Sequence, residues 1–268
     1  MPFQTVNGIR IYYEEQGEGF PLLLIQGLGY PSGLWFLQIP EFARSFRTIT
    51  FDNRGVGKTD RPDTEYSVPL MASDAAELLR ALGISRAHLV GVSLGGYIAQ
   101  DLALRHPDLV DRLVLMSTSC GGPQYLELTK DLWQEVAALA GLPAAEIFLR
   151  GMVLAVSRRF ALQHPELLDR SVAIRSENIQ PFYAFKHQSD AAMNFDSRAR
   201  AQMIHRPTLI LAGSQDRVMP LSLTQELAQK IPQACLKVFP EAGHLLFLEE
   251  AQAVNSLIVD FLLEDKAA

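Results

Sequence analysis

Short apolar runs alternate with amphipathic segments along most of the chain. The runs that we interpret as strands are Leu22–Ile25, Thr48–Phe51, His88–Val92, Leu113–Met116 and Thr208–Leu211. Except for the alternating Thr48–Phe51, they are almost continuously hydrophobic, as is typical of strands buried on both faces. Segments with helical spacing lie between them, at about 34–45, 69–82, 94–105 and 220–231. This alternation predicts an α/β fold with a mostly parallel sheet and helices on both faces.

The pattern predicts structure most clearly at the two ends of the chain. Asn7-Gly8 is a dipeptide favoured in tight type I′ turns, and alternating apolar residues follow it, so a hairpin is expected at the start of the sheet. The last predicted helix places its apolar residues at helical spacing, in Val254, Leu257, Ile258, Phe261 and Leu262.

The interval from Cys120 to Arg206 contains no convincing strand, although a crossover between parallel strands needs only about a dozen residues. Its helical stretches are Tyr125–Leu139, Ala144–Val156, Glu166–Arg175 and Pro181–Met193. We interpret residues 121–202 as a helical cap inserted into a core made of 1–120 and 203–268. Such a cap would cover the carboxyl edge of the sheet, where open α/β sheets bind ligands. Additional scaffold helices are the alternative.

The composition narrows the class of protein. The chain has 268 residues, 48% of them hydrophobic and 20% charged, with a net charge of −6, which argues against a nucleic-acid or anionic-membrane surface. The N-terminus shows no signal peptide and no apolar run approaches the roughly twenty residues of a membrane span. The two cysteines, Cys120 and Cys235, are interpreted as reduced thiols, with a single disulfide between them as the alternative. We expect a cytoplasmic protein whose partner is a small molecule, with its oligomeric state undetermined.

One sequence motif indicates a candidate catalytic residue. Gly91-Val92-Ser93-Leu94-Gly95 matches G-x-S-x-G, follows an apolar run and opens a helical segment. That setting is typical of a nucleophile elbow, in which a strained turn lifts the serine oxygen clear of the sheet.

A serine nucleophile requires a general base and a carboxylate that orients the base. In this setting the chain order is serine, acid, histidine. Asp216 follows the predicted strand Thr208–Leu211, and His244 is the one histidine of six that lies beyond it. The pattern therefore predicts a triad of Ser93, Asp216 and His244.

The chain resembles the α/β-hydrolase family along nearly its whole length. The matching motifs are G-V-S-L-G-G at 91–96, D-N-R-G-V-G-K-T-D at 52–60, G-S-Q-D at 213–216 and A-G-H at 242–244. Within the family it is most similar to microbial carboxylesterases, methyl esterases and enol-lactone hydrolases. The resemblance implies a sheet of about eight strands, with Ser93 as nucleophile, His244 as base and Asp216 as its orienting acid.

The resemblance also suggests the surroundings of the triad. The main-chain N–H groups of Leu28 and Leu94 are expected to form the oxyanion hole. Gln26 stands where the family usually has histidine, so the bracing of that loop and the choice of substrate are open. We name five candidate pocket residues: Gln26, Tyr30, Trp35, Phe182 and Phe185.

These features together predict a serine hydrolase that cleaves a small carboxylic ester through an acyl-enzyme, with no cofactor. No motif suggests a metal site. The same triad could instead open enol-lactones, cleave carbon–carbon bonds or perform cofactor-free perhydrolysis. A ligand-binding receptor with vestigial hydrolysis is the alternative outside enzymes.

Overall fold

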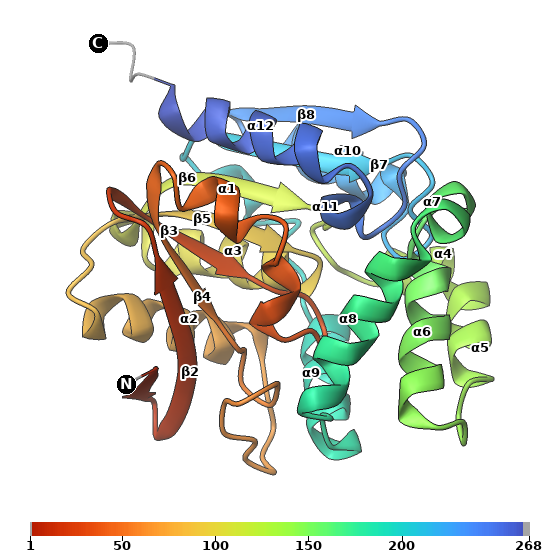
Figure 1. Ribbon diagram of the computed structural model, residues 1–268. Coiled ribbons are helices and arrows are strands. Elements are labelled where there is room, and N and C mark those ends of the chain that lie inside the picture. Colours follow the sequence, from red (N-terminus) through yellow and green to blue (C-terminus); the bar gives the residue numbers. More distant parts are fainter. Residues whose placement is uncertain (1, 265–268) are drawn as a thin grey trace.

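The computed structural model describes residues 2–264, which form an eight-stranded sheet flanked by helices (Figure 1). The strand order across the sheet is β1-β2-β4-β3-β5-β6-β7-β8. The strands are β1 (Phe3–Val6), β2 (Ile9–Gln16), β3 (Phe20–Ile25), β4 (Phe46–Phe51), β5 (Ala87–Val92), β6 (Val110–Met116), β7 (Thr208–Gly213) and β8 (Ala234–Phe239). Strands β3 to β8 pair in parallel, whereas β1 and β2 form an antiparallel edge. The predicted fold class is confirmed.

The first hairpin turns at the predicted dipeptide. Val6 pairs with Ile9, and the two residues between them, Asn7 and Gly8, have φ angles of 47° and 76°. Positive φ at both central positions is the signature of a type I′ turn, whose twist matches that of the flanking strands.

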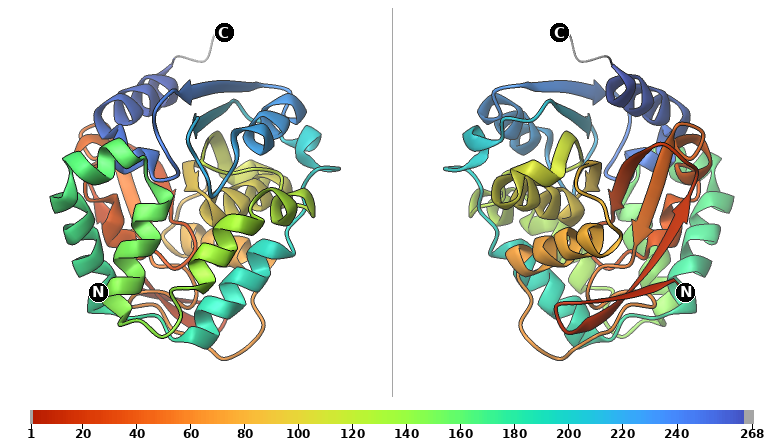
Figure 2. Two further views of the ribbon diagram at one scale, coloured as in Figure 1. Left: turned by 90° about the vertical axis from the view of Figure 1, so that its right-hand side faces the viewer. Right: turned by 90° about the vertical axis from the view of Figure 1, so that its left-hand side faces the viewer.

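The apolar runs supply two layers of core. Along β3, Leu23 and Ile25 pack on one face of the sheet, while Leu22 and Leu24 pack on the other. The first face is covered by α2 (Val68–Ala81), α3 (Leu94–Arg105) and α10 (Leu221–Lys230), and the second by α1 (Ile39–Phe42), α11 (Leu246–Glu249) and α12 (Ala251–Leu263) (Figure 2). Successive side chains point to opposite faces, so a strand covered on both sides must be apolar throughout.

Two predicted helices are shorter than expected. The segment 34–45 contains a 3₁₀ turn, Ser32–Trp35, followed by the four-residue helix α1. Pro40 lacks the N–H that a continuous helix would require there, so it stands at the start of α1 instead. The segment Tyr125–Leu139 divides into α4 (Gln124–Leu128) and α5 (Lys130–Ala137), and the hydroxyl of Thr129 donates to the carbonyl of Tyr125 between them.

The chain between β6 and β7 is largely helical. Besides α4 and α5 it forms α6 (Ala144–Ala155), α7 (Arg158–Gln163), α8 (Pro165–Glu177) and α9 (Phe182–Met193), which gather beyond the carboxyl ends of the strands (Figure 1). The two ends of this segment meet: Gly121 and Asp196 form a bridge, and the N–H of Ser197 donates to the carbonyl of Cys120 at 2.8 Å. The division of the chain into a core and a cap remains a prediction.

Candidate active site

Ser93 occupies the sharp turn between β5 and α3. Its φ and ψ angles are 54° and −120°, a conformation that L-residues rarely adopt, and its side chain is partly exposed. Strain of this kind costs on the order of 1–3 kcal/mol and persists only where the surrounding structure imposes it. The turn therefore has the geometry expected of a nucleophile elbow.

Glycines permit the close contacts that impose this turn. A Cβ atom on Gly95 would lie 2.1 Å from the carbonyl oxygen of Ile25, and one on Gly91 would lie 2.4 Å from that of Gly95. Both distances are far below van der Waals contact. The helix α3 can approach β3 and β5 this closely because neither glycine has a side chain.

Asp216 and His244 form a buried pair at the same end of the sheet. The Nδ1 atom of His244 lies 2.8 Å from Oδ2 of Asp216, and both residues are buried. The other carboxylate oxygen, Oδ1, accepts the main-chain N–H groups of Val218 and Met219 at 2.8 and 2.6 Å. The acid is thus fixed on one side, and its free oxygen orients the imidazole. With a proton on Nδ1, the Nε2 atom is left as a proton acceptor.

The turn that carries His244 is also held in place. Its N–H donates to the carbonyl of Ala155 at the end of α6 (2.7 Å), and its carbonyl accepts the Ser117 hydroxyl (2.8 Å). The carboxylate of Glu249 accepts the N–H groups of Gly243 and Ser157 at 2.9 and 3.0 Å. Helix α6 and the histidine turn therefore form one connected unit.

The loop after β3 lies directly against Ser93. A Cβ atom on Gly27 would be 3.2 Å from the Cβ of Ser93, and Leu28 and Leu94 line the same cavity as Ser93. The N–H of Leu94 stands in the first turn of α3, where main-chain donors have no partner within the helix. Two main-chain donors thus come from the elements expected to hold an oxyanion.

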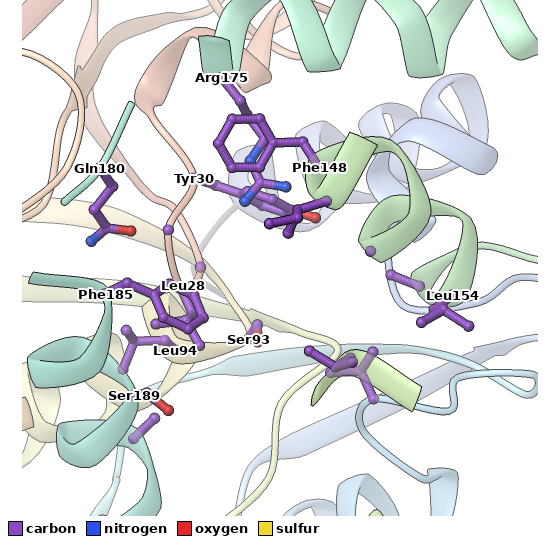
Figure 3. Close-up of a pocket in the computed structure, with 18 of the residues that line it drawn as sticks. Leu28, Tyr30, Ser93, Leu94, Phe148, Leu154, Arg175, Gln180, Phe185 and Ser189 are labelled. Atoms are coloured by element: carbon purple, nitrogen blue, oxygen red, sulfur yellow. The ribbon is translucent and has the colours of Figure 1, made fainter. Parts of the chain in front are cut away.

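These elements enclose a cavity of about 740 Å³ between the sheet edge and helices α4, α5, α6, α8 and α9 (Figure 3). Ser93 and His244 both line it, although no hydrogen bond joins their side chains among residues 2–264. Catalytic hydrogen bonds are often loose without substrate. Most of the wall is aliphatic or aromatic. A cavity of about 300–1,000 Å³ with a few polar groups is typical of a small-molecule site.

Three of the five predicted pocket residues line this cavity. They are Tyr30, Phe185 and Phe182, and Phe182 lies at the outer edge with 79% of its surface exposed. The predictions for Gln26 and Trp35 are wrong. Gln26 is buried beyond the end of β3, where its Oε1 accepts the N–H of Gly27, and Trp35 packs in the core with its ring 5.0 Å from that of Phe247. Neither residue is among those that line the cavity.

Other wall residues were not anticipated. They come from α6, α8 and α9 and include Phe148, Leu154, Arg175 and Ser189 (Figure 3). Amphipathic spacing shows that a helix has an inner face, but it does not distinguish a face that lines a cavity from one that packs in a core.

The described part of the chain offers neither a metal-binding cluster nor a membrane-spanning helix. Residues 2–264 contain no cluster of three or more His, Cys, Asp or Glu side chains that could hold a metal ion. None of the helices in this range is both long and apolar enough to traverse a bilayer.

The chain is similar to known proteins along nearly its whole length. A family model described as the alpha/beta hydrolase fold matches residues 21–251. The chain is 34% identical to a 2-hydroxymuconate semialdehyde hydrolase of Pseudomonas sp. strain CF600, over 97% of this chain and 93% of the relative. Two solved structures, each of a protein 26% identical to this chain, are similar in fold. The enol-lactonase from Burkholderia xenovorans LB400 has a TM-score of 0.86 (98% and 100% covered), and a thermophilic esterase from Thermogutta terrifontis has 0.83 (97% and 96%). The chain belongs to the α/β-hydrolase family.

Proposed function

We propose that this hydrolase cleaves a small carboxylic ester by a two-step mechanism through an acyl-enzyme on Ser93. The observation that carries the proposal is the buried hydrogen bond between Asp216 and His244, with His244 facing the cavity that also contains the strained Ser93. Membership of the family supports hydrolysis in general, and the triad supports the serine mechanism.

The first step forms the acyl-enzyme. Nε2 of His244 removes the hydroxyl proton as Oγ of Ser93 attacks the ester carbonyl, and Asp216 stabilises the resulting imidazolium. The N–H groups of Leu28 and Leu94 hold the negative charge that develops on the carbonyl oxygen. One such donor contributes a factor of about 10²–10³ to the rate. The imidazolium then protonates the leaving alcohol.

The second step releases the acid. Water loses a proton to His244 and attacks the acyl carbon, and the proton returns to Oγ of Ser93 as the carboxylic acid leaves. We propose that residues 121–202 act as a cap during both steps. Helices α4, α5, α6 and α9 supply much of the apolar wall and would exclude bulk water from the acyl-enzyme.

The test is covalent trapping combined with kinetics. Incubation with an alkyl fluorophosphonate should add one phosphonyl group to the peptide containing Ser93, as read by mass spectrometry, and Ser93→Ala should remain unlabelled. The wild type should hydrolyse p-nitrophenyl butyrate, and Ser93→Ala should not. Retention of hydrolysis by Ser93→Ala would contradict the proposal, as would tight ligand binding without product release.

Lactone opening or carbon–carbon bond hydrolysis on the same triad is the second candidate. The names of two similar proteins, an enol-lactonase and a 2-hydroxymuconate semialdehyde hydrolase, favour it. A comparison of kcat/KM for a p-nitrophenyl ester, an enol-lactone and a vinylogous 1,5-diketone separates the three reactions.

A further inference from the structure

Arg175 places a guanidinium group in the wall of the cavity, in the last turn of α8. Its central carbon lies 4.4 Å from the centre of the Tyr30 ring and 4.2 Å from that of Phe148. Figure 3 shows these three side chains grouped in one part of the cavity, apart from Ser93, Leu28 and Leu94. The aromatic contacts stabilise a cation at this position.

Within residues 2–264, Arg175 has no hydrogen-bond or ion-pair partner. Its Nε atom is buried without a hydrogen-bond partner, and the hydrogen bonds and ion pairs of the described residues do not include Arg175. By contrast, the buried Arg54 makes two 2.8 Å hydrogen bonds to the carboxylate of Asp74. None of the described residues that line the cavity is Asp or Glu. Arg175 is partly buried, and withdrawing part of a guanidinium from water without an anion has a free-energy cost, although an arginine keeps its charge in proteins.

The Tyr30 and Phe148 rings do not accept hydrogen bonds from the N–H groups of the Arg175 guanidinium. Aromatic contacts interact with the faces of a guanidinium, whereas its N–H donors point outward in its plane. That planar fork matches the two oxygens of a carboxylate. Burial lowers the pKa of Arg175, and a bound anion would counteract that shift.

We propose that Arg175 binds a carboxylate group of the substrate. The preferred substrates would then be acyl compounds with a second carboxylate, distant from the carbonyl that Ser93 attacks. This inference rests on the proposed function.

The shape and charge of the cavity support a single carboxylate. Tyr30, which contacts Arg175, lies two residues after Leu28 in the same loop, so an anion bound at Arg175 would position the substrate relative to the oxyanion hole. Arg175 is the one Lys or Arg among the described lining residues. A phosphate dianion usually requires more than one cation or donor cluster, which these residues do not supply.

The experiment compares two p-nitrophenyl esters that differ in charge: mono-p-nitrophenyl glutarate, which is an anion at neutral pH, and its methyl ester, which is neutral. The wild type should prefer the anion. Arg175→Met should lower kcat/KM for the anion by about 10- to 100-fold, the range expected for hydrogen bonds to a charged group, and leave the neutral ester within about threefold. Arg170→Met is the matched control, because Arg170 is exposed on the same helix and stacks on Phe36 outside the cavity.

Arg175→Gln keeps polar donors without the charge and serves if Arg175→Met does not fold, as judged by circular dichroism. Equal kcat/KM of the wild type for the two esters would overturn the inference, as would an equal loss on both esters in Arg175→Met. Failure of the wild type to hydrolyse either ester would count against the proposed function instead. Calorimetry would then decide the inference separately: glutarate should bind the wild type and bind Arg175→Met at least about tenfold more weakly, and equal binding would overturn it.

Discussion

The side-chain carbonyl of Gln188 accepts a hydrogen bond from the main-chain N–H of Gly29 at 3.0 Å and so joins helix α9 to the loop that follows β3. The Nε2 atom of Gln188 donates to the carbonyl of Arg54 at 2.8 Å, and the side chain is fully buried. Gly29 follows Leu28, a proposed oxyanion donor. One glutamine thus braces that donor's loop from the helical segment.

Replacing this glutamine should impair both stability and catalysis. Gln188→Met leaves the N–H of Gly29 and the carbonyl of Arg54 buried without partners, at about 1–3 kcal/mol each. We expect the free energy of unfolding to fall by at least about 2 kcal/mol. We also expect kcat to fall about tenfold, with a smaller change in KM, because the loop proposed to hold the transition state is displaced. Urea unfolding and ester kinetics measure the two effects.

The matched control is Gln180→Met. The Nε2 atom of Gln180 donates to the same Oε1 of Gln188 at 3.2 Å, but its loss leaves the bond to Gly29 intact. An unchanged kcat in Gln188→Met, or equal losses in both variants, would show that this bond does not position the loop.

Ser93 provides a test that separates strain from chemistry. Ser93→Ala and Ser93→Gly should each lower kcat by about 10⁴- to 10⁶-fold, because both remove the proposed nucleophile. Their stabilities should differ, since φ is 54° at this position and glycine adopts positive φ without steric cost. We expect Ser93→Gly to exceed Ser93→Ala in unfolding free energy by about 1 kcal/mol. Thermal unfolding of the two variants measures this difference in free energy. A more stable Ser93→Ala would contradict the claim that the backbone at residue 93 is strained.

The local motifs of the site were accessible from the sequence. The Gly91 to Gly95 pentapeptide determines its own turn, because its glycines allow contacts that no other residue would. The positions of Asp216 and His244 follow from where strands end, since the carboxyl ends of parallel strands share one edge. These inferences depend on short stretches of chain and on topology.

The pocket depends on side-chain directions that the sequence does not specify. Gln26 and Trp35 lie close in sequence to the proposed oxyanion loop, yet both are fully buried and do not line the cavity. Helix α8 carries both Arg170 and Arg175. The second faces the cavity because Tyr30 and Phe148 flank it there, a relationship between three separate segments. Periodicity within one helix does not encode such contacts.

Substitution by alanine should have opposite effects on stability at two glycines. Gly95→Ala would place a methyl group 2.1 Å from the carbonyl oxygen of Ile25, so we expect a loss of several kcal/mol or failure to fold. Gly151 lies within α6 with nothing inside 4 Å of the added Cβ position, and Gly151→Ala should stabilise the protein by about 1 kcal/mol through helix propensity. Denaturant unfolding compares them. A destabilised Gly151→Ala would show that this part of α6 is more tightly packed than the structure indicates.

Glu249 should make stability depend on pH. Burial raises the pKa of its carboxyl group, and the negative charge of Asp216 adds to the shift, while the N–H groups of Ser157 and Gly243 oppose it. The folded state therefore retains the proton to higher pH than the unfolded state. The stabilisation is present below the unfolded pKa and is lost as pH rises through the folded pKa.

Glu249→Gln cannot titrate, and its amide oxygen still accepts one main-chain N–H. The unfolding free energy of the wild type minus that of Glu249→Gln should therefore decrease as pH rises from about 4 to about 7. Glu250→Gln is the control, because it shows how the loss of one carboxylate charge at the neighbouring position changes the pH dependence of the unfolding free energy. A difference that grew with pH would mean that the two N–H donors outweigh burial, and that Glu249 is held in its ionised form to fix the histidine turn.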